Sequence, residues 1–314
     1  MTVIDFSVEV WHDTADLRKG LQLEGEPMPP TMSPNTEFGV FAVSELEALD
    51  QFFVEHGFAI LRGVFAEPDL SKMTAECVGA QTGVIEGKLE SRYGNSVLLD
   101  DEVDAETRFT NYVQYITEIS SLTRRADLDP AIVELMDRWV PDGHLQEHSR
   151  FGVVYQDARG GRNSGYRRIG WHSDWQSGPH RDVWPSVAFT INIDATSPDN
   201  GFLRVVPGSH KWATPAPHRY VNNVAVPDGS IAAGGYTDVS PPIDMPLGFE
   251  KVPGEIAVYC NAGDILFHDA YLWHSAAAAT NDKAIRRHVR GSWYSGQPDE
   301  QHEDFVEDFV KNAA

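Results

Sequence analysis

The sequence predicts a mainly β domain of the sandwich or barrel class, with helices on its flanks. From residue 151 onward, short apolar runs are separated by Gly, Pro, Asn and Asp, a pattern typical of short strands and turns. The chain has no GxGxxG after a strand, no GxxxxGK followed by Ser or Thr, and no GxSxG. Nucleotide-dependent dehydrogenases, P-loop proteins and α/β-hydrolases are therefore not supported.

The N-terminal part predicts an extension followed by a helix and a strand. Residues 1–43 are mixed in character and rich in proline, so we expect an irregular extension there. Ser44 and Glu47 form the capping pattern of a helix start, and apolar residues then follow at helical spacing. Gly57 is typical of a helix end, and the apolar run 58–64 predicts a buried strand.

The rest of the chain predicts one domain over residues 44–296. Further helices are expected over residues 69–78 and 131–140. Residues 213–250 are rich in Pro, Gly and Ala and predict an insertion, and residues 297–314 form an acidic tail. Six apolar runs predict strands, at residues 151–155, 186–193, 201–206, 255–259, 264–267 and 286–294.

Composition excludes several classes of partner. The 314 residues include 47 acidic and 25 basic side chains, giving a formal net charge of −22. Such a charge opposes binding to nucleic acids and anionic membranes. There is no 18-residue apolar run and no N-terminal secretion signal, so neither a membrane span nor export is expected. The two cysteines, Cys77 and Cys260, form no CxxC motif, and we expect a cytoplasmic protein.

The segment GWHSDW at residues 170–175 predicts a metal site. In an extended segment the side chains of His172 and Asp174 share one face, so a nitrogen and an oxygen can meet one ion. The distant segment 264–275 offers two further candidates, His268 and His274. Two histidines and one carboxylate with open positions opposite are the facial triad of non-heme Fe(II) oxygenases. Zn(II) and Mn(II) would also accept these ligands.

Several motifs together resemble the phytanoyl-CoA dioxygenase family, which includes ectoine hydroxylase. The helix–strand segment 49–64 is similar to the opening of that family. The other matching motifs are WHSD at 171–174, NG at 200–201, PGSHK at 207–211, GDILFH at 263–268 and HS at 274–275. The resemblance implies a double-stranded β-helix that uses Fe(II), 2-oxoglutarate and O2. It also implies that His172, Asp174 and His274 are the iron ligands and that His268 has a structural or supporting role.

A 2-oxoglutarate bound in a barrel needs a cation for its far carboxylate. An arginine suits a planar carboxylate because its guanidinium can donate two parallel hydrogen bonds. The family places such an arginine about a dozen residues after the second histidine. The spacing here leaves Arg286 and Arg287 both eligible, on opposite faces of one strand, and Trp293 seven residues downstream favours Arg286. Arg290 shares the face of Arg286 and is a further candidate.

Other candidates line the cosubstrate and substrate sites. Gln156 matches a glutamine of ectoine hydroxylase-like members, and Asn192 could hydrogen-bond a cosubstrate carboxylate from a barrel strand. Trp175, His180 and Arg168 flank the HxD motif and are candidates for the substrate pocket. Asp174 argues against halogenation, since related halogenases replace this carboxylate with a small residue.

The resemblance implies a dioxygenase that oxidises a C–H bond of a small molecule, such as a secondary metabolite or an amino-acid derivative. Hydroxylation, desaturation, epimerisation and ring formation all stay open, and the sequence does not reveal the oligomeric state. The alternative is a cupin-like metal protein without oxygenase activity, either a zinc hydrolase or a ligand-binding module.

Overall fold

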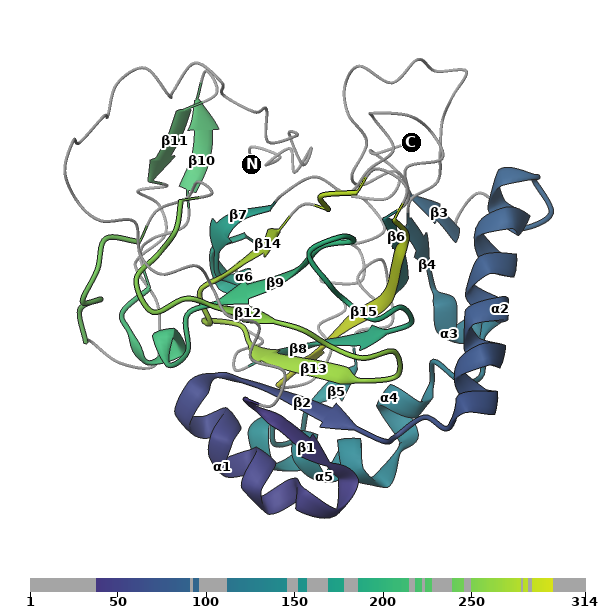
Figure 1. Cartoon of the computed structure of the whole chain (residues 1–314), viewed down its shortest axis with the longest axis horizontal. Helices are drawn as coiled ribbons and strands as arrows, with labels where there is room; N and C mark the ends of the chain where they lie inside the picture. The colour runs from purple at the N-terminus through teal and green to yellow at the C-terminus, as the bar shows by residue number, and fades with distance from the viewer. Residues whose placement is uncertain are drawn as a thin grey trace.

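A computed structural model (Figure 1) describes most of the region from residue 38 to residue 295. The described residues are 38–90, 93–95, 112–145, 152–156, 169–177, 186–214, 218–221, 224–227, 239–245, 250–277, 279–281 and 284–295. The acidic tail and most of the N-terminal extension lie outside this set. Among the described residues, no helix combines the length and the apolar character needed to cross a bilayer.

Two β-sheets form the centre of the molecule. The larger has the strand order β1-β2-β13-β8-β15-β6-β4-β3, with β5 also paired to β15. Its strands are β1 (Val40–Ala42), β2 (Phe58–Arg62), β3 (Gly94–Asn95), β4 (Tyr112–Gln114), β5 (His144–Leu145), β6 (Gly152–Gln156), β8 (Ser186–Asn192), β13 (Ile265–Asp269) and β15 (Arg286–Tyr294). The smaller sheet has the order β12-β9-β14-β7. Its strands are β7 (Ile169–His172), β9 (Phe202–Val205), β12 (Ile256–Val258) and β14 (His274–Ala277).

The chain passes back and forth between these sheets. Strands β6, β8, β13 and β15 are neighbours in the large sheet, and β7, β9, β12 and β14 form the small sheet. Two facing four-stranded layers connected in this way make a double-stranded β-helix, or jelly roll. The predicted fold class is therefore confirmed.

Helices cover the outer face of the large sheet. Figure 1 shows α1 (Leu46–His56) and α5 (Pro130–Trp139) below the strands and α2 (Glu67–Ile85) along the right-hand side. The ring of Phe53 on α1 stacks on Trp139 of α5 with centroids 3.8 Å apart, and Trp139 in turn meets Phe267 of β13. One apolar core lies between helices and sheet, and its strand residues include Val187, Phe189, Ile191, Phe267 and Val289. Because strand side chains alternate, the residues between these point into the barrel.

The first helix ends as the sequence predicts but begins differently. Gly57 follows α1 with φ 78°, a left-handed conformation that favours glycine. At the other end, Ser44 lies within a short 3₁₀ turn, Val43–Glu45, rather than capping the helix. The carboxylate of Glu45 accepts a hydrogen bond from the backbone N–H of Ala42 instead (2.8 Å). An acidic side chain in the turn thus replaces the predicted serine cap.

The predicted elements occur with shifted ends. Helix α2 extends beyond the predicted residues 69–78 on both sides, and strand β14 was not among the six predicted strands. Strand β1 lies within the expected N-terminal extension and pairs in parallel with β2. The remaining helices are the short segments α3 (Ile116–Ile119), α4 (Arg125–Leu128), α6 (Asp174–Ser177) and a 3₁₀ turn, Ser209–Lys211.

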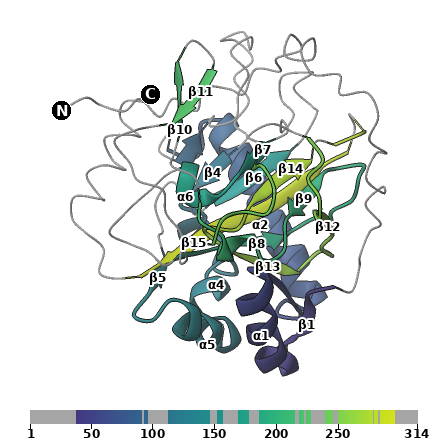
Figure 2. The same cartoon turned by 90° about the vertical axis from the view of Figure 1, so that its left-hand side faces the viewer.

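The region expected to be an insertion contains several described segments. A hairpin of β10 (His218–Val221) and β11 (Val224–Pro227) projects on the side away from α1 and α5, as both views show (Figure 2). Residues 239–245 lie against the small sheet, where Ile243 and Met245 pack on a buried cluster that includes Trp171. The indole of Trp171 donates to the carbonyl of Glu250 (2.8 Å), and Arg204 lies 4.7 Å above the same indole. These contacts hold the backbone of β7 next to His172.

Candidate metal centre

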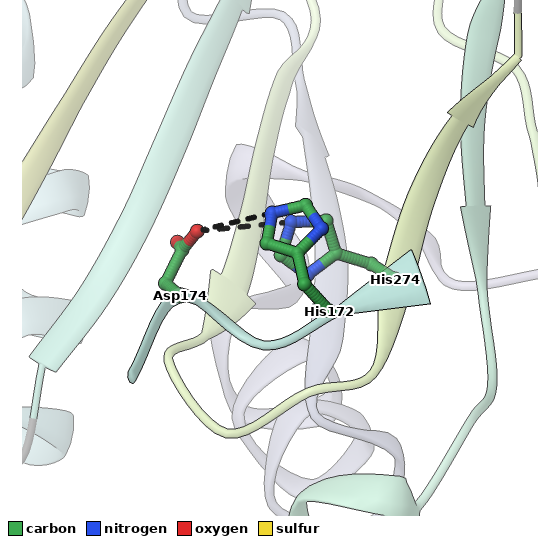
Figure 3. A group of neighbouring side chains, drawn as sticks. All are labelled: His172, Asp174 and His274. Carbon is green, nitrogen blue, oxygen red and sulfur yellow. Dashed lines mark ion pairs between the residues drawn. The ribbon is translucent and has the colours of Figure 1, made fainter. Parts of the chain in front are cut away.

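Three elements bring one histidine or carboxylate each to a single point (Figure 3). His172 is the last residue of β7, Asp174 begins α6, and His274 is the first residue of β14. Strands β7 and β14 are antiparallel neighbours in which His172 lies opposite His274. This pairing joins segments that are about a hundred residues apart in the sequence. One ligand atom from each of the three residues lies within 4.8 Å of the others.

The ligand atoms face one another because a backbone carbonyl group fixes the orientation of each imidazole ring through its Nδ1. Nδ1 of His172 is 2.8 Å from the carbonyl oxygen of Gly170, and Nδ1 of His274 is 2.9 Å from that of Leu272. A proton on each Nδ1 satisfies these contacts and leaves the Nε2 lone pairs available. Oδ1 of Asp174 lies 3.9 Å from Nε2 of His172 and 3.7 Å from Nε2 of His274.

The fourth polar group, His268, contacts the other oxygen of the carboxylate. Its Nε2 donates a hydrogen bond to Oδ2 of Asp174 (3.0 Å), and its ring centroid is 4.6 Å from that of His274. The spacing alone left His268 and His274 open as the third ligand, and the family resemblance favoured His274. In the structure His274 joins the cluster of three, whereas His268 supports the carboxylate from the side.

The surroundings favour the charge states that a cation needs. Burial lowers the pKa of both His172 and His274, so both rings are neutral. Burial alone would raise the pKa of Asp174, but the hydrogen bond from His268 and the adjacent histidines hold it well below its usual range. Neutral imidazole and ionised carboxylate are the forms that bind metals. Two nitrogens and one oxygen, without thiolate, fit Fe(II), and also Zn(II) or Mn(II).

Strand β15 places the two arginine candidates on opposite sides of the large sheet. Arg287 points outward, where its Nε and Nη2 donate to the two carboxylate oxygens of Asp194 (2.7 and 2.6 Å). Arg286 lies on the barrel side and is 6% exposed. His288 and Arg290 follow on the same side, and Arg290 is exposed. The guanidinium of Arg287 is thus engaged in a bidentate ion pair, and Arg286 is the buried inward cation.

The other predicted site residues have varied surroundings. Gln156 lies opposite Arg286 in the pairing of β6 with β15, and only its backbone is described. The amide of Asn192 is buried and donates to the carbonyl of Asp264 (3.3 Å) and more weakly to that of Thr190 (3.4 Å). Trp175 is buried, with its ring 5.6 Å from that of Tyr271. His180 and Arg168 lie outside the described residues.

One inward residue was not singled out from the sequence. His288 is buried on the barrel side of β15, between Arg286 and Arg290. Burial, reinforced by these two arginines, lowers the pKa of His288 well below its usual value. His288 could have been identified from the sequence. Residues alternate between the two faces of a strand, so position 288 shares a face with positions 286 and 290, which were both candidates.

Comparison with known proteins agrees with this architecture. A model of the family described as phytanoyl-CoA dioxygenase matches residues 53–289. The ectoine dioxygenase of Nocardia farcinica (strain IFM 10152) is 27% identical over 177 residues, which are 53% of this chain and 53% of that protein. The chain thus matches about half the length of this curated relative.

Solved structures share the fold at low sequence identity. EctD from S. alaskensis with bound Fe is 14% identical, with a TM-score of 0.55 over 86% of this chain and 84% of that one. The carbocyclase SnoK from nogalamycin biosynthesis is 18% identical, with a TM-score of 0.55 over 87% of this chain and 93% of that one. Since the family model matches most of its length, the chain belongs to the phytanoyl-CoA dioxygenase family.

Proposed function

We propose that the protein is an Fe(II)- and 2-oxoglutarate-dependent dioxygenase that oxidises a C–H bond of a small molecule. The observation that carries this proposal is the convergence of His172, Asp174 and His274 within 4.8 Å. These three residues would hold Fe(II), and an ion with three protein ligands would have room for 2-oxoglutarate and O2.

Arg286 is the proposed partner of the far carboxylate of 2-oxoglutarate. A buried, uncompensated carboxylate would be costly, and a buried inward guanidinium offsets that cost with a bidentate hydrogen bond. Arg287 does not compete for this role, because Asp194 already occupies its guanidinium fork. Gln156, beside Arg286 in the sheet, and Asn192, opposite His288, are proposed to line the same part of the barrel.

Each side chain has a defined task in this reaction. When bound, Fe(II) would supply the oxidising centre at which 2-oxoglutarate and O2 give succinate and CO2, and in a hydroxylation the second oxygen atom of O2 would enter the substrate. His172, Asp174 and His274 hold the ion, and Arg286 orients the cosubstrate. Asp174 retains 30% exposure of its side chain, against 13% for His172 and 7% for His274, so the centre is most open on the Asp174 side. A substrate is proposed to approach from that side.

The proposed substrate is a small molecule rather than a macromolecule. The curated relative is named for ectoine, a small solute, and the net charge of −22 opposes a nucleic acid. Trp175, His180 and Arg168 stay candidates for its pocket. The solved structures that share the fold include a carbocyclase and an epimerase, so ring formation and epimerisation are proposed beside hydroxylation as outcomes of the C–H oxidation.

Release of succinate tests the proposal. The purified protein is incubated with Fe(II), 2-oxoglutarate, O2 and a panel of metabolites that includes ectoine, and succinate is measured for each compound. We expect at least one compound to stimulate succinate formation in the parent protein and none to do so in His172→Ala. Conversion of a panel compound that needs Zn(II) but neither 2-oxoglutarate nor O2 would instead establish the hydrolase alternative.

A further inference from the structure

The hydrogen bond between His268 and Asp174 has a consequence for the number of open positions at the metal. Nε2 of His268 is 3.0 Å from Oδ2 of Asp174, while Oδ1 is the oxygen closer to His172 and His274. One oxygen therefore faces the ligand cluster and the other is held by a donor. A carboxylate can bind a metal through one oxygen or through both.

We infer that His268 is a positioning residue that keeps Asp174 a single-oxygen ligand. This inference rests on the proposed function. If both oxygens of Asp174 bound the ion, four of six positions would be occupied by protein. Two positions would remain for the three atoms that 2-oxoglutarate and O2 must supply. The hydrogen bond to Oδ2 competes with the second metal contact and so preserves the third open position.

The surroundings of His268 fix it for this role. The residue is 7% exposed and lies on β13, which pairs with β2 on one side and β8 on the other. Its Nδ1 is buried and has no hydrogen-bond partner among the described residues. A proton on Nε2 matches the 3.0 Å contact with Oδ2 of Asp174, and the absence of a partner at Nδ1 gives no reason to place the proton there instead.

Three substitutions separate this role from simple packing. Gln can place an amide N–H near the position of Nε2, whereas the amide of Asn is too short to reach Oδ2. Leu fills a similar volume without any donor. His210→Leu is the matched control, because His210 is also a buried histidine but contacts the carbonyl of Val54 and not the metal centre.

The measurement has two stages, both without O2. Titration with Co(II) alone, followed by its visible absorption, first identifies the variants that retain the three-residue metal site. The dissociation constant for 2-oxoglutarate is then measured at saturating Fe(II). We expect the constant to rise at least tenfold in His268→Leu and His268→Asn, and to stay within threefold of the parent in His268→Gln and His210→Leu.

One result would overturn the inference. It is a 2-oxoglutarate dissociation constant in His268→Asn equal to that in His268→Gln, with Co(II) binding intact in both. This comparison holds even if the Leu variant does not fold. Failure of the parent protein itself to bind 2-oxoglutarate with Fe(II) would instead contradict the proposed function.

Discussion

Neighbouring arginines on one strand have opposite surroundings and should behave differently when replaced. Arg286 is buried on the barrel side, and Arg287 forms a bidentate pair with Asp194 on the other side. We expect Arg286→Gln to raise the dissociation constant for 2-oxoglutarate at least tenfold, because the amide cannot form a charged fork with the far carboxylate. Arg287→Gln should leave that constant within threefold and lower the thermal midpoint. The reverse order would assign the cosubstrate to Arg287.

His210 should make stability depend on pH. Burial lowers the pKa of this histidine from its ordinary value of 6.5 to about 4, and its Nδ1 has no hydrogen-bond partner among the described residues. The unfolded chain therefore binds a proton more readily between these values. The contribution of neutral His210 to the free energy of unfolding is fully present above about pH 6.5. It decreases as the pH falls and is lost below about pH 4.

Urea unfolding at pH 7, 6 and 5 measures this effect. At about 1.4 kcal/mol per pKa unit, the parent should lose about 2 kcal/mol more than His210→Leu between pH 7 and pH 5. Parallel loss of stability in the two proteins would show that protonation of His210 is not responsible.

The three residues proposed as metal ligands could be selected from sequence, but the contacts that support them could not. The HxD spacing and the family motifs pointed to His172, Asp174 and His274 together. The hydrogen bond from His268 to the second oxygen of Asp174 depends on side-chain orientation across two sheets, which a sequence pattern does not contain. Our proposal of Arg286 over Arg287 rests on which face of β15 each side chain occupies and on the position of Asp194, and neither could be read from the sequence.

At the scale of elements, two features of the end of α1 favour glycine at position 57. They are the left-handed backbone conformation and the close approach of His210. Gly57 has φ 78°, and a Cβ at this position would overlap Nδ1 and the ring of His210. Gly63 has φ 91°, but no atom lies within 4 Å of a Cβ built there. The two glycines therefore share a left-handed conformation and differ in the space around them.

Alanine substitutions separate these two effects. We expect Gly63→Ala to cost about 1 kcal/mol from left-handed strain alone. Gly57→Ala should cost about 3 kcal/mol, because strain is joined by displacement of a buried ring. The free energies of unfolding in urea provide the comparison, and equal costs would show that His210 moves aside without penalty.

Elements with strong local signals were predicted well. The apolar runs along β8 and β15 and the helical spacing of α1 identify those segments from sequence alone. Strand β14 was not predicted because its residues, His274–Ala277, lack the β-branched and aromatic side chains typical of strands. Its neighbours β7 and β9, which pair with it on both sides, make it a strand despite that composition.

At the scale of the whole molecule, the site depends on the pairing of strands that are far apart in the sequence. The sequence separates His274 from the HxD motif by about a hundred residues, and the pairing of β14 with β7 places it opposite His172. The sheet order that produces this pairing is not readable from local patterns. The family resemblance implied only the fold class, a double-stranded β-helix, and the observed strand order is consistent with that fold.

Anaerobic spectroscopy tests most directly whether His172, Asp174 and His274 form an Fe(II) site that binds 2-oxoglutarate, since this measurement requires no substrate. When 2-oxoglutarate is added to the Fe(II)-loaded protein, we predict a weak visible charge-transfer band, because the cosubstrate chelates an ion held by His172, Asp174 and His274. The band should be absent from His172→Ala under the same conditions. Full binding of Fe(II) by the parent protein with no band at saturating 2-oxoglutarate would contradict the assignment.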